Sequence, residues 1–131
     1  MQSRIEKQVY YHDTDAVGIM YYGAYLKILE EGRTDFLEKH GVFVGALHKE
    51  EKYFVIKELN VNYLRPACFG DCVMCESYVE RFTSARIFFK QKVLNKNNGK
   101  HILEAHVVLV VLNKQLKPVR ITKSMGTCFI E

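Results

Sequence analysis

The sequence has no apolar run of the length that an export signal or a membrane-spanning helix requires. Its first eight residues, MQSRIEKQ, are mostly polar or charged, whereas a signal peptide carries an apolar stretch of about 7–15 residues. Nothing in the chain approaches the roughly 18 consecutive apolar residues of a membrane span. We therefore expect a cytoplasmic protein, and we expect its 4 cysteines to be reduced thiols, because the cytosol keeps thiols reduced.

An excess of charge of one sign is also missing. The 19 basic and 15 acidic residues leave a formal net charge of +4. This charge is too small and too scattered for a nucleic-acid-binding surface, although it suits an anionic small molecule. The chain has no internal repeat and no linker, so its 131 residues predict a single domain, residues 1–131. A chain of this length can bury about two-thirds of its unfolded surface without disulfides or metals.

Motifs for metals and phosphates are incomplete or missing. Cys72 and Cys75 form one C-x-x-C, but no second pair and no H-x-x-x-H accompanies it. Residues three apart on a strand also point to opposite faces. The sequence has no glycine-rich phosphate loop and places no histidine beside a cysteine to activate a thiol. We expect no metal and no other cofactor.

Residues 22–40 carry the one long helical pattern. Apolar or small side chains recur at Tyr25, Leu29, Gly32 and Phe36, which is the spacing of one buried helix face. A glycine inside a helix costs about 1 kcal/mol relative to alanine. Gly32 therefore predicts a point where the helix lies close against a sheet.

The rest of the chain is rich in strand patterns. β-Branched and aromatic residues between turn signals predict five strands, at residues 5–11, 53–64, 72–82, 86–94 and 102–112. Residues 42–52 are expected to connect the helix to the sheet, and residues 119–130 show no clear pattern. One helix and five mostly hairpin-linked strands predict an α+β domain, with the helix covering one face of an antiparallel sheet.

The fifth predicted strand bears on assembly. Residues 106–112 are apolar without alternation, which is typical of a central strand that is buried on both faces. The single helix can cover only one face of the sheet. We therefore expect another subunit to cover the other face, and hence a homo-oligomer.

An acidic turn, Asp13-Thr14-Asp15, precedes the helix. Aspartates at this place commonly cap helices or form turns, and we expect Asp13 to do only that. Asp15 has a second interpretation, because the short segment before Tyr22 can fold back and bring its carboxylate to the free N–H groups of the helix start. Those groups would polarise a carbonyl, which the carboxylate would attack directly or through a water.

Residues 12–37, HDTDAVGIMYYGAYLKILEEGRTDFL, resemble the signature of the hotdog-fold acyl-CoA thioesterases, in the 4-hydroxybenzoyl-CoA thioesterase and YbgC-like branch. The positions that match are Tyr11, Asp13, Asp15, Gly18, Tyr21, Tyr25, Glu30 and Arg33. The resemblance continues through residues 54–71, a strand that ends in Pro-Ala and turns at an aspartate. It implies a five-stranded antiparallel sheet wrapped around one long central helix, with the fifth strand central. It also implies dimers or tetramers with active sites at subunit interfaces.

The resemblance implies roles for individual residues. Asp15, the second aspartate of the motif, would be the catalytic carboxylate. The backbone N–H groups near Tyr22 and Gly23 would bind the thioester carbonyl. Further substrate contacts would come from Gly18, Tyr21 and Tyr25.

One position separates the branches of this family. Many YbgC-like members have histidine where this chain has Tyr22, whereas the benzoyl-CoA branch has tyrosine there. The acyl group therefore stays open between a short chain and an aromatic group. A second hotdog clade uses a helix glutamate, which would be Glu30 or Glu31. The D-x-D motif is intact, however, and Glu30 is expected to pair with Arg33 three residues on.

Basic residues could hold the phosphates of a CoA substrate. Arg86, Lys90 and Lys92 lie at even spacings, so they share one face of the fourth strand. That face is either a solvated surface or a contact for CoA phosphates. Arg65 and Lys57 are the other basic candidates.

We therefore predict an acyl-CoA thioesterase that acts as a dimer or a homotetramer, with CoA or an acyl carrier protein as the carrier of its substrate. The alternative is a non-catalytic hotdog subunit that binds acyl-CoA or acyl carrier protein. A hotdog dehydratase would need a histidine beside a helix carboxylate, and no histidine is suitably placed. Release of free thiol from a panel of acyl-CoAs would separate the enzyme from the binding subunit.

Overall fold

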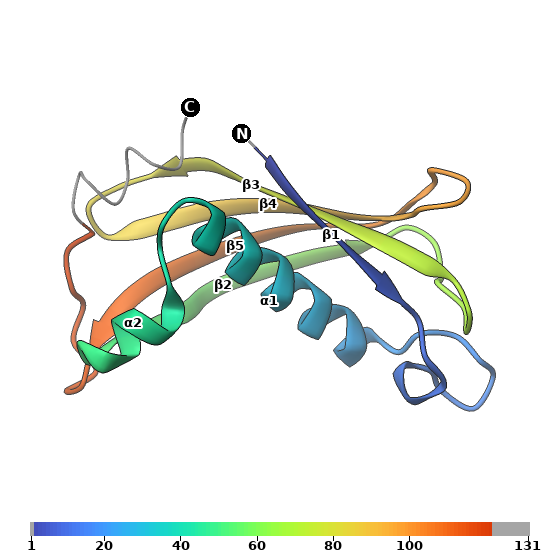
Figure 1. Cartoon of the computed structure of the whole chain (residues 1–131), viewed down its shortest axis with the longest axis horizontal. Helices are drawn as coiled ribbons and strands as arrows, with labels where there is room; N and C mark the ends of the chain where they lie inside the picture. The colour runs from blue at the N-terminus through green and yellow to red at the C-terminus, as the bar shows by residue number, and fades with distance from the viewer. Residues whose placement is uncertain (1, 122–131) are drawn as a thin grey trace.

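The computed structural model describes residues 2–121, which form one curved sheet and two helices (Figure 1). The strands are β1 (Gln2–Gln8), β2 (Lys52–Tyr63), β3 (Cys72–Phe82), β4 (Arg86–Asn95) and β5 (His101–Asn113). The helices are α1 (Tyr22–Lys39) and the short α2 (Val44–Lys49), and a 3-10 turn spans Tyr11–Asp13. None of the helices in this part of the chain is long and apolar enough to cross a membrane.

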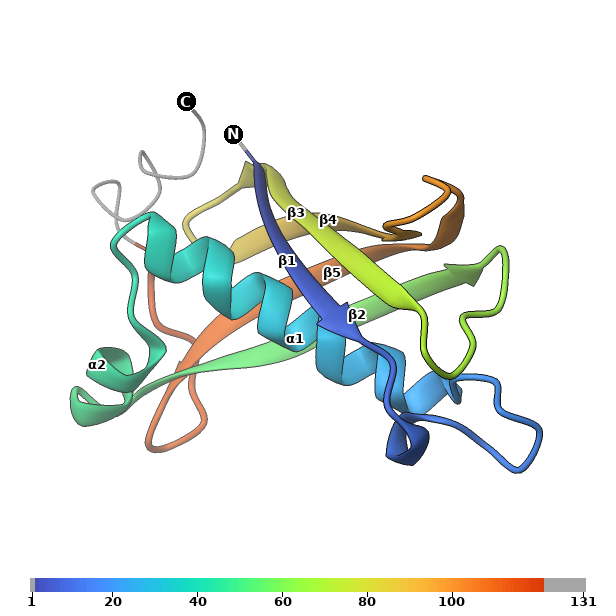
Figure 2. The ribbon, with the colours of Figure 1, turned by 45° about the vertical axis from the view of Figure 1, so that its right-hand side comes forward.

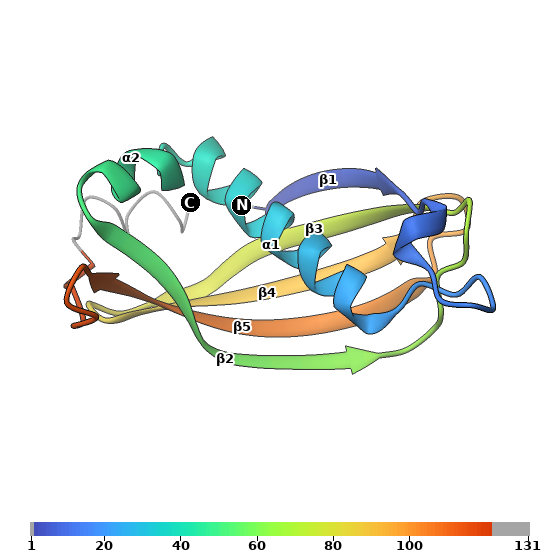
Figure 3. The same ribbon diagram turned by 90° about the horizontal axis from the view of Figure 1, so that it is seen from below.

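The five strands pair antiparallel in the order β1-β3-β4-β5-β2. The sheet curls around α1, which lies across one of its faces (Figures 2 and 3). This arrangement confirms the predicted α+β fold. The prediction that β5 is the central strand was wrong, because β4 is the middle strand and β5 lies between β4 and the edge strand β2. β5 is still an interior strand, and its consecutive residues Val107, Val108 and Leu109 are all buried, so side chains on both of its faces are covered.

The buried face of α1 forms the core with the sheet. Leu29 and Phe36 are fully buried, and the Phe36 ring packs edge-on against that of Phe89 on β4, with centroids 5.4 Å apart. Gly32 confirms the predicted close approach. A Cβ atom added there would lie 2.8 Å from Ser77 Oγ on β3 and 3.1 Å from Gln91 Nε2 on β4.

Most of the helix and strand boundaries predicted from the sequence lie within two residues of those in the structure. The first strand was the exception, because it was expected to run to Tyr11 but β1 ends at Gln8. Asp13 explains the difference: its Oδ2 accepts a hydrogen bond from Tyr10 N at 3.0 Å, and the backbone curls into the 3-10 turn instead of extending.

The segment after β5 returns to the sheet. Val119 N donates to Val111 O at 2.8 Å, and Ile121 N donates to Ser84 O at 2.7 Å. Ile121 is buried. The remainder of the stretch without a clear pattern, residues 122–130, lies outside the described residues, as does Cys128.

Candidate active site

The chain between the 3-10 turn and α1 forms a small hairpin. Tyr21 N donates to Asp13 O at 3.1 Å, and Asp15 N donates to Ile19 O at 2.9 Å. Thr14 and Met20 pair between these two bonds. Gly18 takes a φ of +79° at the tip, a conformation that favours glycine. The hairpin therefore holds Asp15 in a fixed position just ahead of the helix.

The two aspartates of the motif have different surroundings. The Asp13 carboxylate faces back to Tyr10 and closes the 3-10 turn, which is the structural role expected for it. Asp15 Oδ1 accepts hydrogen bonds from Val17 N at 2.9 Å and from Ile19 N at 3.2 Å. Its second oxygen, Oδ2, has no hydrogen-bond partner within residues 2–121. One half of the Asp15 carboxylate anchors the hairpin and the other half is available.

The start of α1 has unpaired donors. Tyr21 is the N-cap residue, and its side chain makes no capping hydrogen bond. The first N–H groups of an α-helix have no partner inside the helix. Those of Tyr22 and Gly23 find none elsewhere in the described chain. The Tyr21 ring covers Gly23, where an added Cβ would lie 2.9 Å from Tyr21 Cε2.

A cavity of about 560 Å³ opens beside this helix start. We call it the entrance pocket. It is lined by Ile19, Met20, Tyr22, Tyr25, Tyr63, Leu64, Arg65 and Pro66. Ile19 is the residue that pairs with Asp15 across the hairpin. The pocket, the unpaired N–H of Tyr22 and the Asp15 hairpin therefore meet at one end of α1.

The tyrosines of the motif do different things. Tyr22 is 74% exposed and lines the entrance pocket. Tyr25 is buried, and its hydroxyl accepts a hydrogen bond from Ala67 N at 3.0 Å. The rings of Tyr25 and Tyr63 are neighbours, with centroids 5.6 Å apart. Burial raises the pKa of both hydroxyl groups. Tyr21 and Gly18 do not line the pocket, so the structure gives them roles in the hairpin and the helix start.

The basic residues of β4 lie on the other side of the sheet. Arg86, Lys90 and Lys92 do share one face, as predicted, but the residues that alternate with them are buried beneath α1. The basic residue that lines the entrance pocket is Arg65, whose Nη1 donates to His101 O at 3.0 Å. The sequence carried a signal for this arrangement, because the alternating apolar residues of β4 had to face the helix.

The glutamate–arginine pair of α1 also differs from expectation. The Arg33 guanidinium donates to Gln91 Oε1 at 3.0 Å, and Glu30 Oε1 accepts from Thr34 Oγ1 at 3.1 Å.

Cys75 is buried, and this burial raises the pKa of its thiol to about 11. Within residues 2–121 no three His, Cys, Asp or Glu side chains gather in a way that could hold a metal ion.

Comparisons with known proteins converge on one family. The family model described as the thioesterase superfamily matches residues 17–102. The acyl-CoA thioesterase YbgC of Haemophilus influenzae is 32% identical over 123 residues, which cover 93% of this chain and 90% of that protein.

Solved structures agree. A probable thioesterase from Bartonella henselae superposes with a TM-score of 0.87 at 28% identity, covering 93% of this chain and 100% of that one. The DHNA-CoA thioesterase from Staphylococcus aureus superposes with a TM-score of 0.87 at 26% identity, covering 91% of this chain and 80% of that one.

Proposed function

The chain belongs to the thioesterase superfamily, and from this premise we propose that it hydrolyses acyl-CoA at the start of α1, with Asp15 as the reacting carboxylate. The enzyme class, a thioester hydrolase acting on acyl-CoA, follows from the relatives. The observation that supports the site is that Asp15 pairs with Ile19 across the hairpin, and that Ile19 and Tyr22, the first residue of α1, both line the entrance pocket.

The proposed reaction needs one donor site and one carboxylate. The thioester carbonyl oxygen binds the N–H groups of Tyr22 and Gly23, which stabilise the negative charge of the tetrahedral intermediate. One well-placed donor of this kind contributes about 3–4 kcal/mol to lowering the barrier. The C–S bond then breaks, and the products are the free carboxylate and CoA thiol, with one water consumed and one proton released.

Asp15 can act in either of two ways. As a general base, its free Oδ2 takes a proton from the attacking water and later passes a proton to the leaving thiolate. As a nucleophile, Oδ2 attacks the carbonyl carbon itself, CoA thiol leaves, and water hydrolyses the resulting anhydride. A burst of CoA thiol in the first turnover would identify the nucleophilic route, because an acyl-enzyme would accumulate.

The entrance pocket suits a short-chain or aromatic acyl group. Its volume of about 560 Å³ lies in the range of pockets that hold small organic ligands. Tyr22, Tyr25 and Tyr63 supply aromatic walls. The Staphylococcus aureus neighbour acts on DHNA-CoA, which favours the aromatic choice. Arg65 at the same pocket is the side chain that we propose for the CoA phosphates.

We also propose a homo-oligomer, a dimer or a tetramer. β2 is a 12-residue edge strand that pairs with β5 alone among the described strands, and the side chain of Val55, which alternates with the pocket-lining Phe54 and Ile56, is exposed on its outer face. Long apolar edge strands are normally covered in a stable protein. A second copy of the chain is the occupant that we propose for this edge.

The test is Asp15→Asn assayed with a panel of short-chain, aromatic and longer acyl-CoAs. We expect kcat to fall about 10²–10⁴-fold, while circular dichroism and the melting temperature stay close to wild type, because an asparagine Oδ1 can still accept the Val17 and Ile19 hydrogen bonds. Asp35→Asn is the matched control, since Asp35 lies about 20 Å along α1 from Tyr22 at 1.5 Å per residue. Near-wild-type turnover by Asp15→Asn would remove Asp15 from the mechanism.

A further inference from the structure

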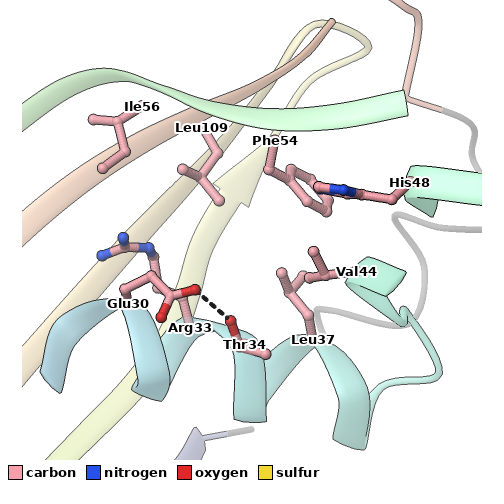
Figure 4. A pocket seen from close by; sticks show the side chains of 9 residues that line it. All are labelled: Glu30, Arg33, Thr34, Leu37, Val44, His48, Phe54, Ile56 and Leu109. Atoms are coloured by element: carbon pink, nitrogen blue, oxygen red, sulfur yellow. Dashed lines mark hydrogen bonds between the residues drawn. The ribbon is translucent and has the colours of Figure 1, made fainter. Parts of the chain in front are cut away.

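A second cavity, of about 250 Å³, lies farther along α1 (Figure 4). We call it the distal pocket. Its walls come from α1, α2, β2 and β5, and it is lined by Glu30, Arg33, Thr34, Leu37, Val44, His48, Phe54, Ile56 and Leu109. An apolar cavity of about 150 Å³ is enough to hold benzene. The distal pocket therefore has room for the end of an acyl chain.

Arg33 is the unusual member of this lining. Arg33 is only 5% exposed, yet no carboxylate of the described chain lies within ion-pair distance of its guanidinium. Burial lowers the pKa of Arg33, and the nearby charge of Glu30 opposes that shift. A guanidinium has five N–H donors, and the one hydrogen bond found within residues 2–121 goes to Gln91. A buried cation with spare donors facing a cavity favours an acceptor in that cavity.

Gln91 fixes the position of Arg33. Gln91 is fully buried, and its Nε2 donates to Leu29 O and to Ser77 Oγ, both at 2.8 Å. Both amide hydrogens are therefore committed, and the amide oxygen must face Arg33. The close contact of Gly32 with Ser77 keeps the helix at this depth. The guanidinium is thus positioned by the sheet rather than by an acid in the pocket.

Glu30 adds an acceptor at the same end of the distal pocket. Glu30 and Arg33 both project from α1 into the pocket, opposite Ile56 on β2, with the Glu30 carboxylate turned toward Thr34, while Val44, Leu37 and Phe54 line the apolar end (Figure 4). A hydroxyl group placed between the two charges could accept from Arg33 and donate to Glu30. A carboxylate would instead bring its charge against that of Glu30. The pair therefore suits a hydroxyl better than an acid.

An exposed apolar side chain on α1 lies between the two pockets. Tyr22 lines the entrance pocket and Glu30 lines the distal pocket. Leu26, which is exposed, lies between them on the same stripe, because residues four apart share a helix face. From Tyr22 to Glu30 the helix rises about 12 Å at 1.5 Å per residue. An extended chain advances roughly 1.2 Å per bond, as the protein backbone does, so roughly ten bonds span this distance.

β2 also carries an exposed apolar side chain between the two pockets. Tyr63 lines the entrance pocket, Ile56 lines the distal pocket, and exposed Leu59 lies between them. Leu59 and Ile56 are three residues apart, so a regular strand would point them to opposite faces. The pairing with β5 skips Lys57, and this bulge puts both side chains on the face toward α1.

We propose that the enzyme also accepts acyl groups of about ten chain atoms that end in a hydroxyl, and that the hydroxyl binds between Arg33 and Glu30 in the distal pocket. This inference rests on the proposed function, since the thioester must lie at the start of α1. It adds a longer, polar-tipped class of substrate to the short-chain and aromatic groups.

The experiment compares three CoA thioesters: decanoyl-CoA, ω-hydroxydecanoyl-CoA and the ω-carboxy analogue. We expect kcat/KM for the hydroxy compound to exceed that for decanoyl-CoA roughly tenfold or more, because a hydrogen bond to a charged group is worth about one to two factors of ten. The carboxy compound should be poorer than the hydroxy compound. Arg33→Met and Glu30→Ala should each lower the hydroxy preference, while Arg4→Met, on β1, should leave it unchanged.

Two readouts separate this proposal from the proposed function. If no acyl-CoA is hydrolysed, calorimetry with the same three thioesters still measures the preference of the distal pocket. If hydrolysis does occur, calorimetry is done with Asp15→Asn, in which turnover is expected to be suppressed. Glu30 is exposed, so Glu30→Ala tests the pocket even if Arg33→Met does not fold. Equal binding and turnover of decanoyl-CoA and the hydroxy compound, or a preference for the carboxy compound, would overturn the proposal.

Discussion

Replacing Gly32 by alanine puts one carbon where the helix has no room. The added Cβ would lie 2.8 Å from Ser77 Oγ, 2.9 Å from Cys75 Sγ and 3.1 Å from Gln91 Nε2. Alanine gains about 1 kcal/mol over glycine in helix propensity. Overpacking costs about 1–3 kcal/mol, and a displaced Gln91 amide would leave buried groups unpaired at about 1–3 kcal/mol more. We therefore expect Gly32→Ala to lower the free energy of unfolding by about 1–5 kcal/mol.

Urea denaturation at fixed protein concentration measures this change, because the midpoint shifts while the slope stays constant if only stability has altered. Gly45→Ala in α2 is the matched control. An added Cβ at Gly45 has no neighbour within 4 Å, so this variant should be as stable as wild type or slightly more stable. Cys75→Ala combined with Gly32→Ala should recover part of the loss by making room. A Gly32→Ala protein with wild-type or greater stability would refute the packing account.

Two further predictions concern ionisable groups. Burial raises the pKa of the Cys75 thiol to about 11. The folded protein therefore keeps a proton that the unfolded chain loses from about pH 9. Because of this difference, the free energy of unfolding should fall between about pH 9 and 11, by up to about 1.4 kcal/mol per pH unit. Cys75→Ala should show a shallower decline in urea titrations, and an identical decline would contradict this. Arg65→Met should raise KM for acyl-CoA several-fold and weaken its dependence on salt, with kcat little changed, because a phosphate contact away from the carbonyl contributes to binding. An unchanged KM at low ionic strength would exclude Arg65 as a phosphate contact.

Local patterns in the sequence were enough for most of the fold. The spacing of Tyr25, Leu29 and Phe36 predicted α1 because helix periodicity repeats over a few residues. The glycine at position 32, inside the helix, indicated the close contact with the sheet. The order of strands is not a local property, so the apolar run of β5 suggested a central place that β4 actually holds.

The site was predictable only in part. The helix start at Tyr22 was expected, and so was a short segment before it that folds back from Asp15, but the pairing that makes this segment a hairpin was not. Arg33 was expected to pair with Glu30, three residues away, but it donates to Gln91, which is 58 residues distant in the chain. Such a partner depends on how helix and sheet pack, and no spacing in the sequence reveals it. Family membership favours the enzyme over the non-catalytic subunit.

The extra residue in β2 has a consequence for how this protein can change through evolution. Because Lys57 has no partner on β5, the strand consists of two halves whose side chains alternate in opposite phase. Loss of one residue there would turn Phe54 and Ile56 outward and present their neighbours to the distal pocket, while the half that ends at Tyr63 kept its pairing. A single-codon deletion or insertion could therefore exchange the lining of one pocket and leave the reacting end of the enzyme intact.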